Sequence, residues 1–209
     1  MDWSKANEVK GHRITKCFNT GKCPNKAIIA EGLFQELEKL MSKKELRSFL
    51  IKRIEGPLKL HHEFRISISD CPNACSRPQI ADIGLIGACI PRVTDNFCNE
   101  CGLCAETCKE NAISLIGNRP RIIQEKCLYC GQCVDVCQSG ALSKGKVGYR
   151  IQVGGKLGRH PRLGQELPGI YDPEETLKII DRCVEYYKIH CHEGERLGEI
   201  IEKIGVNLP

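Results

Sequence analysis

No stretch of this sequence is apolar for long enough to cross a bilayer. The longest apolar tract runs from Ile80 to Ile90 and is interrupted by Asp82, whereas a membrane-spanning helix needs a run of roughly 20 apolar residues. The start, Met1 to Arg13, is polar and of mixed charge, with neither the apolar core of a secretory signal nor a twin-arginine pair. These absences predict a cytoplasmic protein with no membrane partner.

The sequence also lacks the scattered cysteine spacing of a secreted disulfide framework. Its 15 cysteines stand mostly in groups, at intervals of two or three residues, and this is the spacing of metal ligands. A chain of 209 residues can bury enough apolar surface to fold without disulfides. Thiolate ligands therefore indicate a reducing compartment.

The formal charge of +5 does not indicate a nucleic-acid partner. That count treats every cysteine as neutral, whereas four thiolates on an oxidised cubane leave a charge of about −2 per cluster. Three such clusters bring the total to about −1 by the same count. We therefore interpret the basic excess as counter-charge for bound cofactors and expect no nucleic acid to bind.

An internal repeat is the clearest signal in the sequence. Two runs have the spacing C-x2-C-x2-C-x3-C and stand 29 residues apart: Cys98, Cys101, Cys104 and Cys108, then Cys127, Cys130, Cys133 and Cys137. In two-cluster ferredoxins, which this stretch resembles, the last cysteine of each run binds the other cluster. The predicted ligand sets are therefore Cys98, Cys101, Cys104 and Cys137 for one [4Fe–4S] cluster, and Cys127, Cys130, Cys133 and Cys108 for another.

Two features qualify that resemblance. Lys109 and Gln138 follow the fourth cysteines, where the ferredoxin pattern usually has proline. Zinc is the rival metal, because thiolates at C-x2-C spacing also bind it, but zinc sites usually use two pairs of ligands. The third and fourth cysteines of each run therefore favour iron–sulfur clusters.

The rest of the chain alternates helical and extended patterns. Apolar spacing predicts a helix within Ala30–Ile54 and a strand over Glu63–Ser69 that leads to Cys71. Tyr149 to Val153 alternates as a strand before a glycine-rich turn. Asp172 is a predicted helix cap, and a final helix follows Gly194. We predict an α+β domain formed by residues 1–92 and 144–209, with a two-cluster ferredoxin domain inserted at 93–143.

A second cysteine group lies outside the repeat, with C-x5-C at Cys17 and Cys23 and C-x3-C at Cys71 and Cys75. The surrounding sequence reads RISISDCPNACSRP and runs on into IGLIG, with GGKLGRHP and GERLG further along. These segments resemble the siroheme and [4Fe–4S] domain of sulfite and nitrite reductases, in particular the ferredoxin-bearing anaerobic and dissimilatory types. The resemblance covers most of the chain, from Cys17 to Gly205.

The resemblance implies a third [4Fe–4S] cluster on these four cysteines. It also implies that Cys75 bridges this cluster to a siroheme as the shared axial ligand, with Asn73 and Arg77 near the macrocycle. Candidates for holding the siroheme carboxylates are basic residues of the glycine-rich turn, namely Lys156, Arg159, His160 and Arg162. The alternative for each of these basic residues is an ordinary solvated surface charge.

The implied activity is the multi-electron reduction of sulfite to sulfide, or of nitrite to ammonia. An external low-potential donor would supply electrons through the ferredoxin clusters to the coupled centre beside the small anionic substrate. The alternative is a multi-cluster electron-transfer protein or redox subunit without siroheme turnover, because resemblance of fold alone does not establish activity.

Family enzymes carry two related halves, and only sixteen residues precede Cys17 here. We expect a homodimer, or else a partner subunit, to complete the fold. Local candidates for substrate contacts are basic residues near the start of the chain: His12, Arg13, Arg53, Lys59, His61 and His62. The three remaining cysteines are Cys89 and Cys183, which we expect to be buried, and Cys191, which stands beside two histidines.

Overall fold

The computed structural model describes residues 9–17 and 23–205 of the chain. Its centre is a five-stranded sheet in the order β1-β2-β3-β6-β7, and β4 and β5 form a separate two-stranded sheet. The central strands are β1 (His12–Lys16), β2 (Phe64–Ser69), β3 (Ile83–Val93), β6 (Leu142–Val153) and β7 (Gln165–Glu166). Strands β1, β2 and β3 run parallel. Strand β6 pairs antiparallel with β3, and β7 pairs antiparallel with β6. The predicted α+β class is confirmed at this level.

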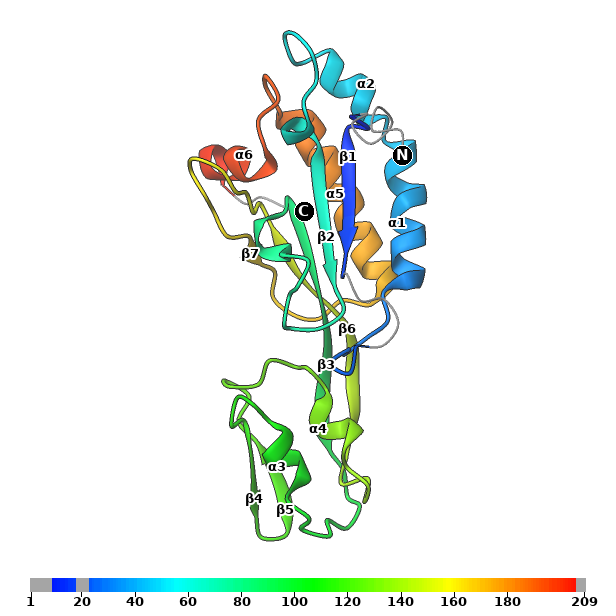
Figure 1. Ribbon diagram of the computed structural model, residues 1–209, viewed down its shortest axis with the longest axis vertical. Coiled ribbons are helices and arrows are strands. Elements are labelled where there is room, and N and C mark those ends of the chain that lie inside the picture. Colours follow the sequence, from blue (N-terminus) through cyan, green and yellow to red (C-terminus); the bar gives the residue numbers. More distant parts are fainter. Residues whose placement is uncertain (1–8, 18–22, 206–209) are drawn as a thin grey trace, which may run out of the picture.

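Helices α1 (Glu31–Lys43) and α5 (Pro173–His190) lie together along one face of this sheet (Figure 1). Their buried apolar side chains join those of the strands and of α6 (Leu197–Ile204) in one core. Helix α5 begins at the predicted cap: Asp172 accepts a hydrogen bond from the amide of Glu175, whose carboxylate accepts one from the amide of Asp172. In the described part of the chain, no helix is long and apolar enough to cross a membrane.

The helix predicted within Ala30–Ile54 is two helices. After α1 the backbone of Glu45 adopts a left-handed conformation, with a φ of 49°, and α2 (Leu46–Ile51) starts in a new direction. Lys44, at the break, forms an ion pair with Asp181 of α5. The expectation of one continuous helix is therefore wrong at this point, because a tertiary contact and the core position of α2 override the local pattern.

Two glycines of β3 allow a loop to lie directly on the sheet. Ile83 and Leu85 face the helices in the core, so Gly84, between them, faces away. A Cβ on Gly84 would lie 2.2 Å from the carbonyl oxygen of Pro78, the first residue of the short 3₁₀ helix η3 (Pro78–Ile80). A Cβ on Gly87 would lie 2.4 Å from the carbonyl oxygen of Asp70. The segment after β2 therefore packs against β3 at distances that exclude side chains. Pro78 lies on the face opposite α1 and α5, whereas Asp70 lies on the helix side, because Gly87 faces the same way as Ile83 and Leu85.

The chain leaves the sheet at the end of β3 and returns at the start of β6. We call residues 94–141 the excursion. It contains α3 (Leu103–Thr107), β4 (Ile113–Ile116), β5 (Arg119–Ile122) and α4 (Gln132–Asp135). Figure 1 shows the excursion below the sheet, carried on the long β3–β6 pair. It has its own small buried cluster, formed by Cys104, Ile113, Cys133 and Leu142.

Candidate metal centres

Two parallel strands bring Cys17 and Cys71 together, although they lie far apart in the sequence. The pairing of Lys16 with Ile68 sets the end of β1 beside the end of β2. The amide of Asp70 then donates a hydrogen bond to Sγ of Cys17, at 3.3 Å. Because parallel strands end at the same edge of a sheet, the segments that follow β1 and β2 share one site. Strand β1 was not predicted from the sequence.

Asp70 also fixes the segment that follows Cys23. Its carbonyl oxygen accepts hydrogen bonds from the amides of Ala27 and Ile28, at 3.0 and 3.2 Å. Its carboxylate lies 3.4 Å from Nζ of Lys26. This one buried residue therefore connects the end of β1, the loop after Cys23 and the residue before Cys71. The sequence placed Asp70 at the end of a strand but gave no signal of these contacts.

The four thiols Cys17, Cys23, Cys71 and Cys75, which we call the core set, interact with one another. Burial raises the pKa of Cys71, and the other three thiols raise it further. A hydrogen bond from the backbone amide of Asn73 acts in the opposite direction. The structure therefore brings the four cysteines of C-x5-C and C-x3-C into one group, as a shared cluster requires; cluster ligation itself stays a prediction.

Cys75 differs from Cys71 in being open to solvent. Cys75 is exposed, whereas Cys71 is buried. The side-chain amide of Asn73 donates to Sγ of Cys75 at 2.9 Å. Ala74 and Arg77 have left-handed backbones with φ values of 54° and 59°. The tight turn thus directs one thiol inward and leaves the other accessible.

Three serine hydroxyls, which we call the serine cluster (Ser67, Ser69 and Ser76), hold this turn against β2. Ser67 donates to the carbonyl oxygen of Ser76 at 2.7 Å, and the hydroxyls of Ser69 and Ser76 are 2.7 Å apart. Ser76 also donates to the carbonyl oxygen of Ile68 at 2.8 Å. Ser67 and Ser69 are buried. Since Ser76 follows Cys75 directly, these bonds fix the backbone that carries the exposed thiol.

In the excursion, Cys98, Cys101, Cys104 and Cys137 line one small cavity of about 10 Å³. Burial raises the pKa of Cys104, and Cys137 and Cys98 raise it further. Burial alone would raise the pKa of Cys137 as well, but hydrogen bonds from Leu142, Ser139 and nearby amides lower it. Donors aimed at sulfur favour its thiolate form. We call these four cysteines the distal set.

The remaining four cysteines of the repeat form a second group, the proximal set of Cys108, Cys127, Cys130 and Cys133. Burial raises the pKa of Cys133 to about 12, and the other three thiols contribute in the same direction. The fourth cysteine of each run therefore lies with the other run. This is the same crossed grouping that the resemblance to two-cluster ferredoxins implies.

The two runs also repeat each other's backbone. Gly102 and Gly131, which precede α3 and α4, have φ values of 77° and 76°. Glu100 and Tyr129, two residues earlier, are left-handed as well, with φ values of 55° and 58°. Both runs therefore wrap their cysteines with the same sequence of turns, as the repeated spacing suggests.

The proximal set adjoins the core set. All four of its cysteines line a cleft of about 200 Å³ that Asn25, Cys71 and Asn73 also line. The side-chain amide of Gln132 donates to Oδ1 of Asn25 at 2.6 Å, which joins the two cysteine regions directly. Cys89 of β3 donates its amide to the carbonyl oxygen of Tyr129 at 2.7 Å. The predicted burial of Cys89 and Cys183 is confirmed, and Cys191 is buried too.

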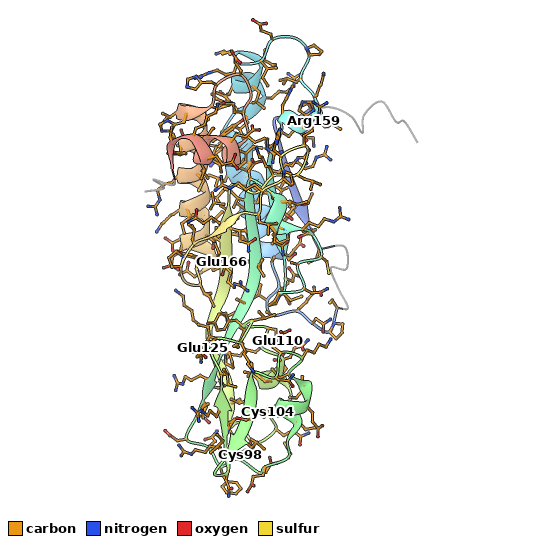
Figure 2. The ribbon with its side chains drawn as sticks, turned by 90° about the vertical axis from the view of Figure 1, so that its left-hand side faces the viewer. Cys98, Cys104, Glu110, Glu125, Arg159 and Glu166 are labelled. Carbon is orange, nitrogen blue, oxygen red and sulfur yellow. The ribbon has the colours of Figure 1, made fainter. Side chains whose placement is uncertain are left out.

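The basic residues of the glycine-rich turn fall into two groups. Lys156 is buried, with Nζ 3.1 Å from a carboxylate oxygen of Glu199, and Arg162 donates to the carbonyl oxygen of Gly198 at 2.7 Å. Both are therefore engaged by α6. Arg159 and His160 are exposed. Figure 2 shows Arg159 at the opposite end of the molecule from Cys98.

The other basic candidates lie around the amino ends of β1 and β2, whereas the cysteines follow the carboxyl ends. His12 begins β1, and Lys59, His61 and His62 precede β2 at η2 (Leu60–His62). Arg13 pairs with Glu63, and Arg53 donates to the carbonyl oxygen of Cys191. The length of a strand therefore separates most of these side chains from the core set.

No group of three or more His, Cys, Asp or Glu side chains within residues 9–17 and 23–205 is arranged to hold a single metal ion. Binding of [4Fe–4S] clusters by the three cysteine groups stays a prediction.

The fold and these three cysteine groups define an α+β protein of the iron–sulfur class. The family model for the nitrite and sulphite reductase 4Fe-4S domain matches residues 12–208. This chain belongs to that family.

Similar proteins include reductases. The coenzyme F420-dependent sulfite reductase of Methanocaldococcus jannaschii is 42% identical over 146 residues, which are 69% of this chain and 23% of that protein. One subunit of the anaerobic sulfite reductase of Salmonella typhimurium is 28% identical over 108 residues, 52% of this chain and 27% of that protein. The chain thus spans about a quarter of the length of these two relatives.

The fold has a counterpart among solved structures. A crystal structure of dissimilatory sulfite reductase I superimposes with a TM-score of 0.61 at 17% identity, covering 92% of this chain and 49% of that one. At that identity the likeness concerns the fold, which is shared over almost the whole chain.

Proposed function

We propose that this chain is the siroheme- and cluster-binding domain of a sulfite reductase, with nitrite as an alternative substrate. The observation that carries the proposal is the convergence of Cys17, Cys23, Cys71 and Cys75, with Cys75 exposed to solvent. A thiolate that binds a cluster on one side and faces solvent on the other can also serve as an axial ligand.

The three cysteine sets suit [4Fe–4S] clusters in their donor chemistry. Backbone amides point at the sulfurs, including Asp70 to Cys17, Ala112 to Cys108 and Leu142 to Cys137, each at 3.3 Å. Such hydrogen bonds stabilise thiolate charge and tune cluster potentials. We assign one cluster to the core set, one to the proximal set and one to the distal set.

Exposed polar side chains on the turn that carries Cys75 and on the glycine-rich turn suit a macrocycle with carboxylates. Asn73 lies on the same turn, within hydrogen-bond distance of the thiol, and Arg159 and His160 are exposed on the glycine-rich turn. Guanidinium groups, including that of Arg77, match carboxylates in geometry and charge. Lys156 is a weaker candidate, because two glutamates of α6 already accompany its ammonium group. Bound siroheme supplies the iron at which sulfite is reduced to sulfide, or nitrite to ammonia.

The cleft shared by the proximal and core sets supports a relay role for the ferredoxin clusters. Electrons from an external low-potential donor would enter at the distal set and leave the proximal set beside Cys71. Gln132 and Asn25 hold the two cysteine regions together. A second copy of the chain or a partner subunit would enclose the small anionic substrate on the exposed face, with the homodimer as our proposal.

Turnover by anaerobically purified protein tests the activity. Reduced viologen is supplied as donor, and sulfide and ammonia are measured with sulfite and nitrite as separate substrates. We expect turnover with at least one anion, its loss in Cys75→Ser and its retention in Cys183→Ala, which removes a buried cysteine of α5. Protein with about twelve irons per chain and no turnover of either anion would support the carrier function instead.

A further inference from the structure

We propose that the end of the excursion is the docking surface for an electron-donating protein whose contact face is basic. The surface consists of Asp95, Phe97, Glu100 and Glu106 around Cys101, and we call it the acidic tip. The inference rests on the proposed function, because it requires a cluster in the distal set.

The distal set opens to solvent at one thiol. Cys101 is exposed, whereas Cys98 and Cys104 are buried. Phe97, beside Cys98, is 77% exposed, the largest fraction among the exposed large apolar side chains of the described chain. An aromatic ring held out in water beside a cofactor site is typical of a contact anchor. Electron transfer is fastest across the shortest path, so a donor seated on Phe97 and Cys101 has the best access.

The charges around Cys101 have one sign. From Thr94 to Cys108 the sequence has three acidic residues, Asp95, Glu100 and Glu106, and no lysine or arginine. All three acidic residues are exposed, and none forms an ion pair with a basic side chain in the described part of the chain. A reduced cluster adds further negative charge. Complementary potentials speed encounter, so the fitting partner is basic.

The two arginines of β5 do not line the cavity of the distal set. Pro120, at the middle of β5, lines the cavity of the distal set. Side chains alternate along a strand, so Arg119 and Arg121 on either side of Pro120 face away from that cavity. Arg121 instead lines a separate groove with Arg92 and Lys146. The acidic tip is therefore not neutralised by these basic residues.

The position of the acidic tip suits an entry point. Figure 2 shows Cys98 near the extremity of the molecule, beyond Cys104. The proximal set, in contrast, shares a cleft with Cys71. A partner bound at the acidic tip therefore leaves the exposed face near Cys75 free for substrate.

Stopped-flow mixing with charged probe proteins tests the inference. The holoprotein is reduced, freed of reductant and mixed without oxygen with a basic c-type cytochrome, so that one electron passes from the protein to the ferric haem. A second series uses an oxidised, acidic plant-type ferredoxin. Iron content and the EPR spectrum of the reduced clusters are recorded first, and turnover with reduced viologen is measured in parallel.

We expect the cytochrome to be reduced about tenfold faster at low than at high ionic strength, since steered encounters are screened by salt. Neutralising the acidic tip in Asp95→Asn/Glu100→Gln/Glu106→Gln should remove that dependence, and Phe97→Ala should slow the reaction at every salt concentration. The control Glu38→Gln/Glu55→Gln/Glu193→Gln makes the same charge change on exposed residues outside the excursion.

The docking site would be overturned if the control variant slowed cytochrome reduction as much as the tip variant does. It would also be overturned if the acidic ferredoxin were reduced faster than the basic cytochrome. In either case, unchanged viologen turnover in the tip variants would show that the proposed function still stands and that only the docking site is wrong. Absence of cluster signals from the distal set would overturn the docking site, which requires that cluster, and would leave the reductase function to the viologen assay.

Discussion

The core set and the excursion sets hold cysteines in different ways. In the excursion, three of the four thiols of each set come from one short loop, and matching left-handed turns at Gly102 and Gly131 repeat the wrapping. In the core set, Cys17 and Cys71 come from two strands and meet only because β1 and β2 pair in parallel. The excursion sites therefore depend mainly on local spacing, and the core site depends on the fold of the whole sheet.

The exposed thiols lie in different surroundings. Cys101 of the distal set stands in a short local loop beside the small buried cluster of the two excursion sets, whereas Cys75 of the core set stands on a turn held against β2. Local loops suffice to carry most thiols of a relay cluster. A centre that must also present a thiol to a second cofactor needs the sheet, its glycines and the serine cluster to define the turn.

The largest expected effect comes from removing a ligand of the core set. Cys71→Ser should lower the iron content from about thirteen per chain, counting the siroheme iron, to about eight and remove the siroheme absorption, because the shared thiolate centre cannot form. Iron and acid-labile sulfide analysis with an absorption spectrum checks this. Retention of siroheme bands in Cys71→Ser would contradict the coupling of the two cofactors.

Removing a ligand of the distal set should have a more local result. Cys104→Ser should lower the iron content by about four per chain and leave the siroheme bands in place, since no core element carries that thiol. Viologen turnover should persist, because a small donor reaches the core directly. Loss of siroheme in this variant would show that the two regions do not form independently.

The buried pair of Asp82 and Arg196 tests the dependence of the core set on its sheet. Asp82 accepts two contacts from Arg196, at 2.9 and 2.7 Å, and one from the amide of Arg65, at 2.8 Å. The substitution Asp82→Asn leaves the charge of Arg196 without its partner. We therefore expect it to lower the free energy of unfolding by about 3–5 kcal/mol.

Urea unfolding followed by circular dichroism measures that loss. Asp135→Asn is the control, because Asp135 belongs to an exposed pair with Lys144, and its effect should stay below about 1 kcal/mol. If the two variants unfold at the same urea concentration, the buried pair does not hold the sheet as we describe.

The smallest expected effect concerns the serine cluster. Ser76→Ala removes the hydroxyl that bonds Ser67 and Ser69, so the free energy of unfolding should fall by about 1–3 kcal/mol. Because Cys75 then moves, the siroheme absorption or its EPR signal should also shift. Ser42→Ala, on the exposed face of α1, serves as the control and should change neither signal. A change in stability with an unaltered spectrum would limit the serine cluster to a structural role.

Local patterns predicted the cysteine runs and the cap of α5, since each depends on residues a few positions apart, and the resemblance to two-cluster ferredoxins implied the crossed grouping of the thiols. Strand β1 could not be predicted in this way, because its short polar sequence becomes a strand only by pairing with β2. The roles of Asp70 and Ser76 were hidden for the same reason: their partners lie on other segments of the chain. The break at Glu45 likewise reflects tertiary contacts of Lys44 with α5.

The absorption spectrum of protein purified without oxygen tests the central claim most directly. A siroheme on Cys75 predicts Soret and red bands in addition to broad cluster absorption, with about twelve irons in cubanes per chain and loss of those bands in Cys75→Ser. Broad cluster absorption alone, at the same cubane iron content, would contradict the account and leave an electron carrier.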